Sequence, residues 1–183
     1  MGRHYPELPE ALQRFIRAQR IFFVATAAPG GHINLSPKGV DSLRILDPHR
    51  ILWLNLTGSG NETAAQVQED PRMTLMFCAF EGPPLIVRVY GQARAIHRRD
   101  PDWPELFAHF DPLPGARQLF ELDIERVQIS CGMGVPLFDY AGERTQLLEW
   151  ARKKGPEGIE RYWAKHNQIS LDGRPTHILR KNT

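Results

Sequence analysis

The chain is 183 residues long, with 42% hydrophobic and 24% charged residues, which is the composition of one ordinary globular domain with a sizeable core. Its net charge of +2 comes from 23 basic against 21 acidic residues, and the basic residues are scattered, so charge does not indicate a nucleic-acid partner. No apolar run approaches a membrane span, and residues 1–10 lack the apolar core of a signal peptide. We therefore expect a cytoplasmic protein that binds neither nucleic acid nor a membrane.

Helix and strand signals follow one another along the chain, with turn residues between them. In chain order we predict a helix over 7–20, strands over 21–27, 32–36, 43–46 and 50–56, a helix over 62–69, strands over 72–80 and 85–96, short helices within 101–121, a strand over 122–130, and two helices within 143–166 divided by Gly155-Pro156. Gly91 is expected to mark a bulge or bend. Six or seven strands at hairpin spacing, with few crossover helices, predict an antiparallel barrel or closed sandwich.

The most unusual stretch is the bare turn Gly58-Ser59-Gly60 between a strand and a short helix. A helix start leaves backbone N–H groups unpaired and carries the positive end of the helix dipole, and glycines let an anion approach the backbone. The hydroxyls of Thr57, Ser59 and Thr63 add donors, so the segment fits a phosphate cradle. It matches neither a Walker loop, nor a GxGxxG turn, nor a nucleophile elbow. A capping box from Ser59 to Glu62, or an N-cap at Asn61, explains the same residues without a ligand.

A second candidate feature is Ser36-Pro37-Lys38 at the end of a strand. Pro37 restricts the backbone, so that Lys38 is presented at the strand end. There it can pair with a phosphate, direct a donor at an electron-rich ring, or simply be solvated. The cysteines Cys78 and Cys131 are expected to be buried thiols, because they form no CxxC pair. The cysteines and histidines show no zinc-ligand spacing and the histidines are dispersed, so we predict no metal site and assign no catalytic residue.

The order of these pieces resembles the pyridoxamine 5'-phosphate oxidase-like family of FMN-binding split barrels, over about residues 8–130. The resemblance is carried by IFFVATAAPGGHINLSPKG, RILWLNLTGSGNETAAQVQEDPRMTLMF and IVRVYGQARAI. It implies a mainly β (α+β) fold, a six-stranded antiparallel split β-barrel with peripheral helices. It also implies a homodimer with FMN at the subunit interface. Residues 1–132 would then form the FMN-binding domain with its N-terminal helix, and residues 133–183 a C-terminal helical extension packed on that domain or on the partner.

The same resemblance assigns roles within the expected site. The isoalloxazine ring would lie beside Ser36, Pro37, Lys38, Asn55, Leu56 and Thr57, and the phosphate against Ser59, Gly60, Asn61, Glu62 and Thr63. Family members that oxidise pyridoxamine phosphate carry an Arg-Lys pair where this chain has Glu62 and Thr63. Glu62 must therefore face away, cap the helix or weaken FMN binding, and Lys38, Arg88 or a partner arginine could supply the lost charge. The vitamin B6 substrate is not carried over.

Three functions are compatible with these features. The first is a flavin-dependent oxidoreductase that acts on an unidentified small molecule with an unidentified electron donor. The second is a non-catalytic module on the same barrel that stores or senses FMN or another flat phosphorylated cofactor. The third is an interaction protein whose cofactor site has decayed, against which the intact Gly58 to Asn61 turn argues.

Overall fold

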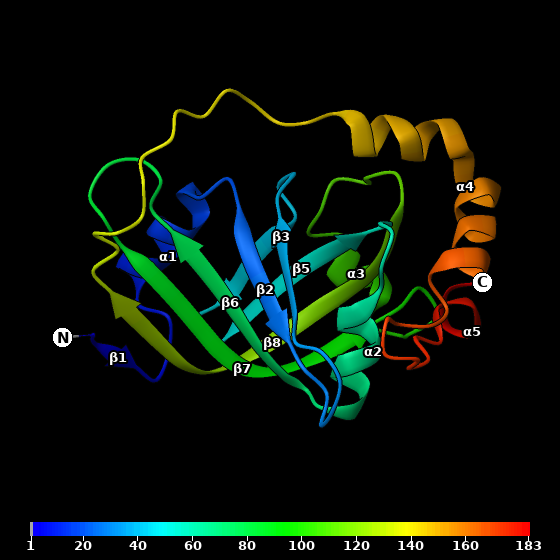
Figure 1. Cartoon of the computed structure of the whole chain (residues 1–183), viewed down its shortest axis with the longest axis horizontal. Coiled ribbons are helices and arrows are strands. Elements are labelled where there is room, and N and C mark those ends of the chain that lie inside the picture. The colour runs from blue at the N-terminus through cyan, green and yellow to red at the C-terminus, as the bar shows by residue number, and fades with distance from the viewer. Residues whose placement is uncertain (1) are drawn as a thin grey trace.

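The structure, a computed structural model, describes residues 2–183 and consists of one strongly curved antiparallel sheet with helices around it (Figure 1). The elements are β1 (His4–Tyr5), α1 (Glu10–Ala18), β2 (Phe22–Thr26), β3 (Asn34–Lys38), β4 (Leu43–Asp47), β5 (Arg50–Leu56), α2 (Glu62–Glu69), β6 (Arg72–Cys78), β7 (Ile86–Ile96), α3 (Trp103–Phe107), β8 (Ala116–Ser130), α4 (Gln146–His166) and α5 (Ile178–Asn182).

The strands are hydrogen-bonded in the order β3-β2-β6-β7-β8-β5-β4, and β1 pairs with β8 outside this path. The strands at the two ends of this order, β3 and β4, are joined directly by residues 39–42, so the sheet must curl to bring its edges together. This confirms the predicted antiparallel barrel class. The sheet has eight strands rather than six, because the two-residue β1 joins the seven strand segments that the sequence predicts.

Aromatic residues from several strands fill the barrel. Trp53 of β5 stacks on Phe120 of β8, with ring centroids 4.6 Å apart, and meets Phe22 of β2 edge-on at 6.2 Å. Leu12 and Ile16 on one face of α1 close the barrel end, as expected of an amphipathic helix. Between Tyr90 and Gly91 the β7–β8 register shifts, which confirms the predicted bulge.

Strand β8 begins at Ala116, so the prediction of helices up to residue 121 is wrong for its second half. The prolines in this stretch favour helices, but α3 is the only helix that the structure forms between residues 101 and 121. Residues 116–121 are all buried between β5 and β7, and a strand buried on both faces lacks the alternation that identifies strands in sequence. The difference matters because it places Arg117 inside the sheet.

The C-terminal part returns to the barrel of its own chain. After β8, residues 131–145 run without helix or strand across one end of the sheet to α4 (Figure 1). Helix α4 is broken at Gly155, whose φ of 65° lies in the left-handed region, and this confirms the predicted division at Gly155-Pro156. Of the helices described in residues 2–183, none combines the length and apolarity that a membrane crossing requires.

Candidate functional site

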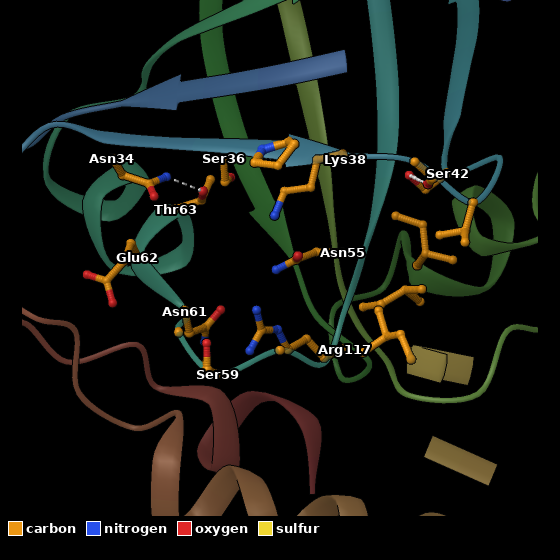
Figure 2. A pocket seen from close by; sticks show the side chains of 18 residues that line it. Asn34, Ser36, Lys38, Ser42, Asn55, Ser59, Asn61, Glu62, Thr63 and Arg117 are labelled. Atoms are coloured by element: carbon orange, nitrogen blue, oxygen red, sulfur yellow. Dashed lines mark hydrogen bonds between the residues drawn. The ribbon is translucent and has the colours of Figure 1, made fainter. Parts of the chain in front are cut away.

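A cavity of about 370 Å³ lies between the end of β3, the end of β5 and the start of α2 (Figure 2). The structure brings ten of the eleven predicted binding residues to its wall: Ser36, Pro37, Lys38, Asn55, Leu56, Ser59, Gly60, Asn61, Glu62 and Thr63. The eleventh, Thr57, is buried in the packing instead. Its hydroxyl donates to the Gly115 carbonyl at 2.7 Å and accepts from the Trp163 indole N–H at 2.8 Å.

The turn and the first residues of α2, residues 58–63, line this cavity. Asn61 is the N-cap of α2, and its side chain makes no capping hydrogen bond. The Glu62 carboxylate accepts instead from the Leu171 amide, at 3.0 and 3.2 Å. The capping-box alternative is therefore wrong, because the side chain that would close it is committed to the C-terminal segment. In the described part of the chain no side chain accepts from the amides of residues 59–63, which leaves them available to an anion.

The Lys38 ammonium lies in this cavity, where burial disfavours its charged form. Burial, together with the nearby charge of Arg117, lowers the pKa of its ammonium from 10.5 to about 8. The ammonium lies 5.5 Å from the ring centroid of Trp53, within the range of a cation–π contact. Within residues 2–183 it has no carboxylate at ion-pair distance. The solvated-lysine alternative does not describe this residue.

Arg117 lines the same cavity and was missed by sequence reasoning. Only 3% of it is exposed, and burial lowers the pKa of its guanidinium below the ordinary value. Its Nη1 donates to Asn167 Oδ1 at 2.9 Å, and its Nη2 lies 3.2 Å from the Asn55 amide, whose oxygen accepts when turned toward it. Because residues 101–121 were predicted to be helical, Arg117 was not placed on a strand. The run of buried residues after it is the signal that could have located it there.

A chain of side-chain hydrogen bonds fixes the start of α2 on the β2–β3 hairpin. Asn34 Nδ2 donates to Thr63 Oγ1 at 3.1 Å and to Thr26 Oγ1 at 3.2 Å. The Thr26 hydroxyl donates in turn to Gln66 Oε1 at 2.7 Å. These contacts hold the helix terminus rigidly against the cavity, which favours a preorganised anion site.

Two polar atoms in the cavity wall are buried without a partner in the described residues: Ser36 Oγ and Asn61 Oδ1. Buried polar atoms are normally hydrogen-bonded, so unpaired ones need a ligand or water. The two cations that line the cavity, Lys38 and Arg117, fit a phosphorylated ligand such as FMN, whereas Asn61 Oδ1 is an acceptor and would need a donor. Nothing in residues 2–183 gathers three His, Cys, Asp or Glu side chains in a way that could hold a metal ion.

Other predicted residues lie away from this cavity. Arg88 donates from Nη1 to Ser130 Oγ at 3.2 Å and does not line the cavity. Cys78 is a buried free thiol, as predicted, whereas Cys131 is exposed because it begins the irregular segment after β8, so that prediction is wrong. After Cys131, the Val135 amide donates to the Gly132 carbonyl at 2.9 Å, which makes this stretch an ordinary turn at the strand exit.

Comparison with known proteins agrees with this fold. The family described as pyridoxamine 5'-phosphate oxidase matches residues 8–131. The chain is also 35% identical over 189 residues to the pyridoxamine 5'-phosphate oxidase family protein ustO of Aspergillus flavus, covering 93% of this chain and 76% of that protein. This chain therefore belongs to the pyridoxamine 5'-phosphate oxidase family.

Solved structures share the fold at low sequence identity. A Lactobacillus delbrueckii protein described as a candidate pyridoxamine 5'-phosphate oxidase superposes with a TM-score of 0.54 at 22% identity, covering 67% of this chain and 94% of that one. HupZ of Group A Streptococcus superposes with a TM-score of 0.52 at 17% identity, covering 66% of this chain and 91% of that one. At these identities the likeness concerns the fold alone.

Proposed function

We propose that this protein binds FMN in the cavity between β3, β5 and α2 and acts as a flavin-dependent oxidoreductase on a small molecule. The observation that carries the proposal is the pairing of two cations, the half-buried Lys38 and the buried Arg117, with the amides of residues 59–63. No carboxylate within the described chain forms an ion pair with either cation. Burying such charges is costly, so the site favours a ligand that brings negative charge.

The Glu62 carboxylate, which would repel a phosphate, forms no ion pair with Lys38 or Arg117 in the described chain, although its charge counteracts part of the lowering of the Arg117 pKa. It accepts from the Leu171 amide at 3.0 Å, and Figure 2 shows it directed away from Lys38 and Arg117. Of the three outcomes expected for Glu62, the contacts support the first, in which it faces away. The phosphate would then lie against Ser59 to Thr63 without a cationic pair on the helix itself.

The opposite wall of the cavity suits a flat ring. It is formed by Ser36 to Lys38 of β3 and by Asn55 and Leu56 of β5. The cavity volume of about 370 Å³ lies within the range of small-molecule sites. Bound FMN would supply hydride and electron chemistry, and Lys38 would place a positive charge near the ring and favour negative charge there.

One observation favours a second function, a non-catalytic flavin store. The residues that line the cavity include no His, Cys or Asp, and the one lining carboxylate, Glu62, is bonded to Leu171. The wall therefore offers Lys38 as its side-chain proton donor, which is enough to bind a flavin and little for acid–base chemistry.

Binding and catalysis are tested in sequence. Protein purified from cells should be yellow, or excess FMN should raise its melting temperature. Anaerobic addition of NADH or NADPH should bleach the yellow form if the protein is an oxidoreductase, whereas a flavin store should keep its colour. A colourless protein whose melting temperature does not move with FMN would contradict both functions.

We also propose a homodimer, with the cofactor at the subunit interface. Large apolar side chains stand exposed along residues 131–145, which cross the barrel end, and at the start of α4: Met133, Leu137, Phe138 and Leu147. Leu147 also lines the cavity, so this surface continues into the site. A second copy of the chain would cover both.

A further inference from the structure

Arg117 is a buried cation whose hydrogen-bonding capacity is only partly used. A guanidinium has five N–H donors. Here Nη1 donates one hydrogen bond to Asn167 Oδ1, and the Asn55 oxygen can accept from Nη2 and Nε. At least one N–H on each terminal nitrogen remains for a ligand. Two parallel donors of this kind match the oxygens of a phosphate.

The position of this guanidinium coincides with the predicted anion site. Figure 2 shows Arg117 beside Ser59 and Asn61, at the end of the cavity formed by the turn, while Lys38 lies nearer Ser36. Asn61 Oδ1 is also buried at this end without a partner in the described residues; as an acceptor it would need a donor, so it does not itself bind the phosphate.

Asn167 holds Arg117 and the turn together. It is fully buried at the C-cap of α4, and its Oδ1 accepts from Arg117 Nη1 at 2.9 Å. Its Nδ2 donates to the carbonyls of Gly58 at 3.1 Å and Ser59 at 3.3 Å. One amide side chain from the C-terminal extension thus fixes the distance between the guanidinium and the free amides of the turn. The orientation of its oxygen and nitrogen is set, because the turn offers acceptors and Arg117 offers donors.

The C-terminal extension is itself anchored at several points around the turn. Trp163 donates to Thr57, Leu171 donates to Glu62, and the hydroxyl of Thr176 donates to the Asn167 carbonyl at 2.6 Å. These contacts leave Asn167 little freedom to move. The C-terminal extension is therefore a preorganised support for the turn and not a loose surface contact.

From these contacts we infer that Arg117, positioned by Asn167, supplies the cationic contact to the ligand's phosphate that the start of α2 lacks. The inference rests on the proposed function, since it assigns one part of the same ligand to one residue. Arg117 is the phosphate-binding residue, and Asn167 is a positioning residue that acts through it.

The test compares FMN with riboflavin, which has the same ring and no phosphate. In Arg117→Met the affinity for FMN should fall about 10- to 100-fold, as expected for the loss of charge-assisted hydrogen bonds, while the affinity for riboflavin changes less than about threefold. Asn167→Ala should lower the FMN-to-riboflavin affinity ratio in the same direction. Arg88→Met is the matched control, since Arg88 lies on the same sheet outside the cavity, and it should leave the ratio unchanged.

Several outcomes would overturn the inference. If wild-type protein binds FMN and the ratio is unchanged in Arg117→Met, Arg117 does not contact the phosphate, although the proposed function stands. If both ligands weaken equally in Asn167→Ala, Asn167 is structural and not a positioning residue. If Arg117→Met fails to fold, Arg117→Gln retains hydrogen-bonding groups without the charge and should give the same loss of ratio. Wild-type protein that binds neither ligand would contradict the proposed function itself.

Discussion

At the scale of single residues, the site depends on two charges that are costly without a ligand. Lys38 and Arg117 lie in one cavity, and the charge of Arg117 adds to the burial that lowers the Lys38 pKa to about 8. The pKa of Arg117 is itself lowered by burial. The negative charge of bound FMN would lower both costs, so FMN binding and the protonation of Lys38 are coupled.

This coupling predicts opposite pH effects on stability and on binding. The unfolded chain keeps the Lys38 proton up to its ordinary pKa of 10.5, whereas the folded, ligand-free protein loses it near 8. The unfolded state therefore binds more protons in this interval, and the stability of the ligand-free protein should rise with pH through it. The affinity for FMN should instead fall by about tenfold between about pH 7 and 9, as the ammonium is lost.

Titrations of FMN across this pH interval check the effect. Lys38→Arg keeps a positive charge and should bind FMN with little change over the same range. An equal fall in Lys38→Arg would show that another group is responsible, and a flat profile in wild-type protein would show that the charge of Lys38 does not contribute to FMN binding.

At the scale of elements, sequence patterns located most strands and helices but not the contacts between distant segments. Helix α2 has the predicted bounds, and β5 does too, because a turn signal and a change of periodicity mark their ends. The start of β8 was missed because residues 116–121 are buried on both faces and carry no alternation. Arg117 was missed with it.

The role of Asn167 could not be predicted for a different reason. It lies 50 residues from Arg117 and more than 100 residues from the turn in the sequence, and no local pattern marks contacts between such distant residues. Glu62 is the converse case. Sequence reasoning identified the difficulty of a carboxylate at the helix start, and only the packing of residues 167–177 showed how it is resolved.

The irregular segment of residues 131–145 exposes apolar side chains, which predicts that a second copy of the chain covers them. Met133 is 80% and Leu137 74% exposed, which is unusual for such residues on a stable monomer surface when they lie together. We expect a dimer of twice 20.9 kDa by light scattering. Leu137→Asp should shift the mass toward the monomer, whereas Leu171→Asp, an equally exposed leucine on the C-terminal loop, should not. A wild-type monomer at high concentration would contradict this proposal.

At the scale of the whole molecule, the barrel and the C-terminal extension act as one unit. The barrel brings β3, β5 and the start of α2 to one cavity, and the extension holds the turn and Arg117 from behind through Trp163 and Asn167. Membership of the pyridoxamine 5'-phosphate oxidase family accounts for residues 8–131. If the proposed function holds, the extension would allow this chain to lack a cationic pair on α2 and still present the positive charge of Arg117 to a phosphate.

The most direct measurement is a crystal structure of the protein grown with FMN. We expect the phosphate to lie against the amides of residues 59–63, with the Arg117 guanidinium in hydrogen-bonding contact. We also expect the ring to lie along Ser36 to Lys38. Electron density for FMN outside this cavity, or a phosphate more than a hydrogen-bond length from both Arg117 and the turn, would contradict this arrangement.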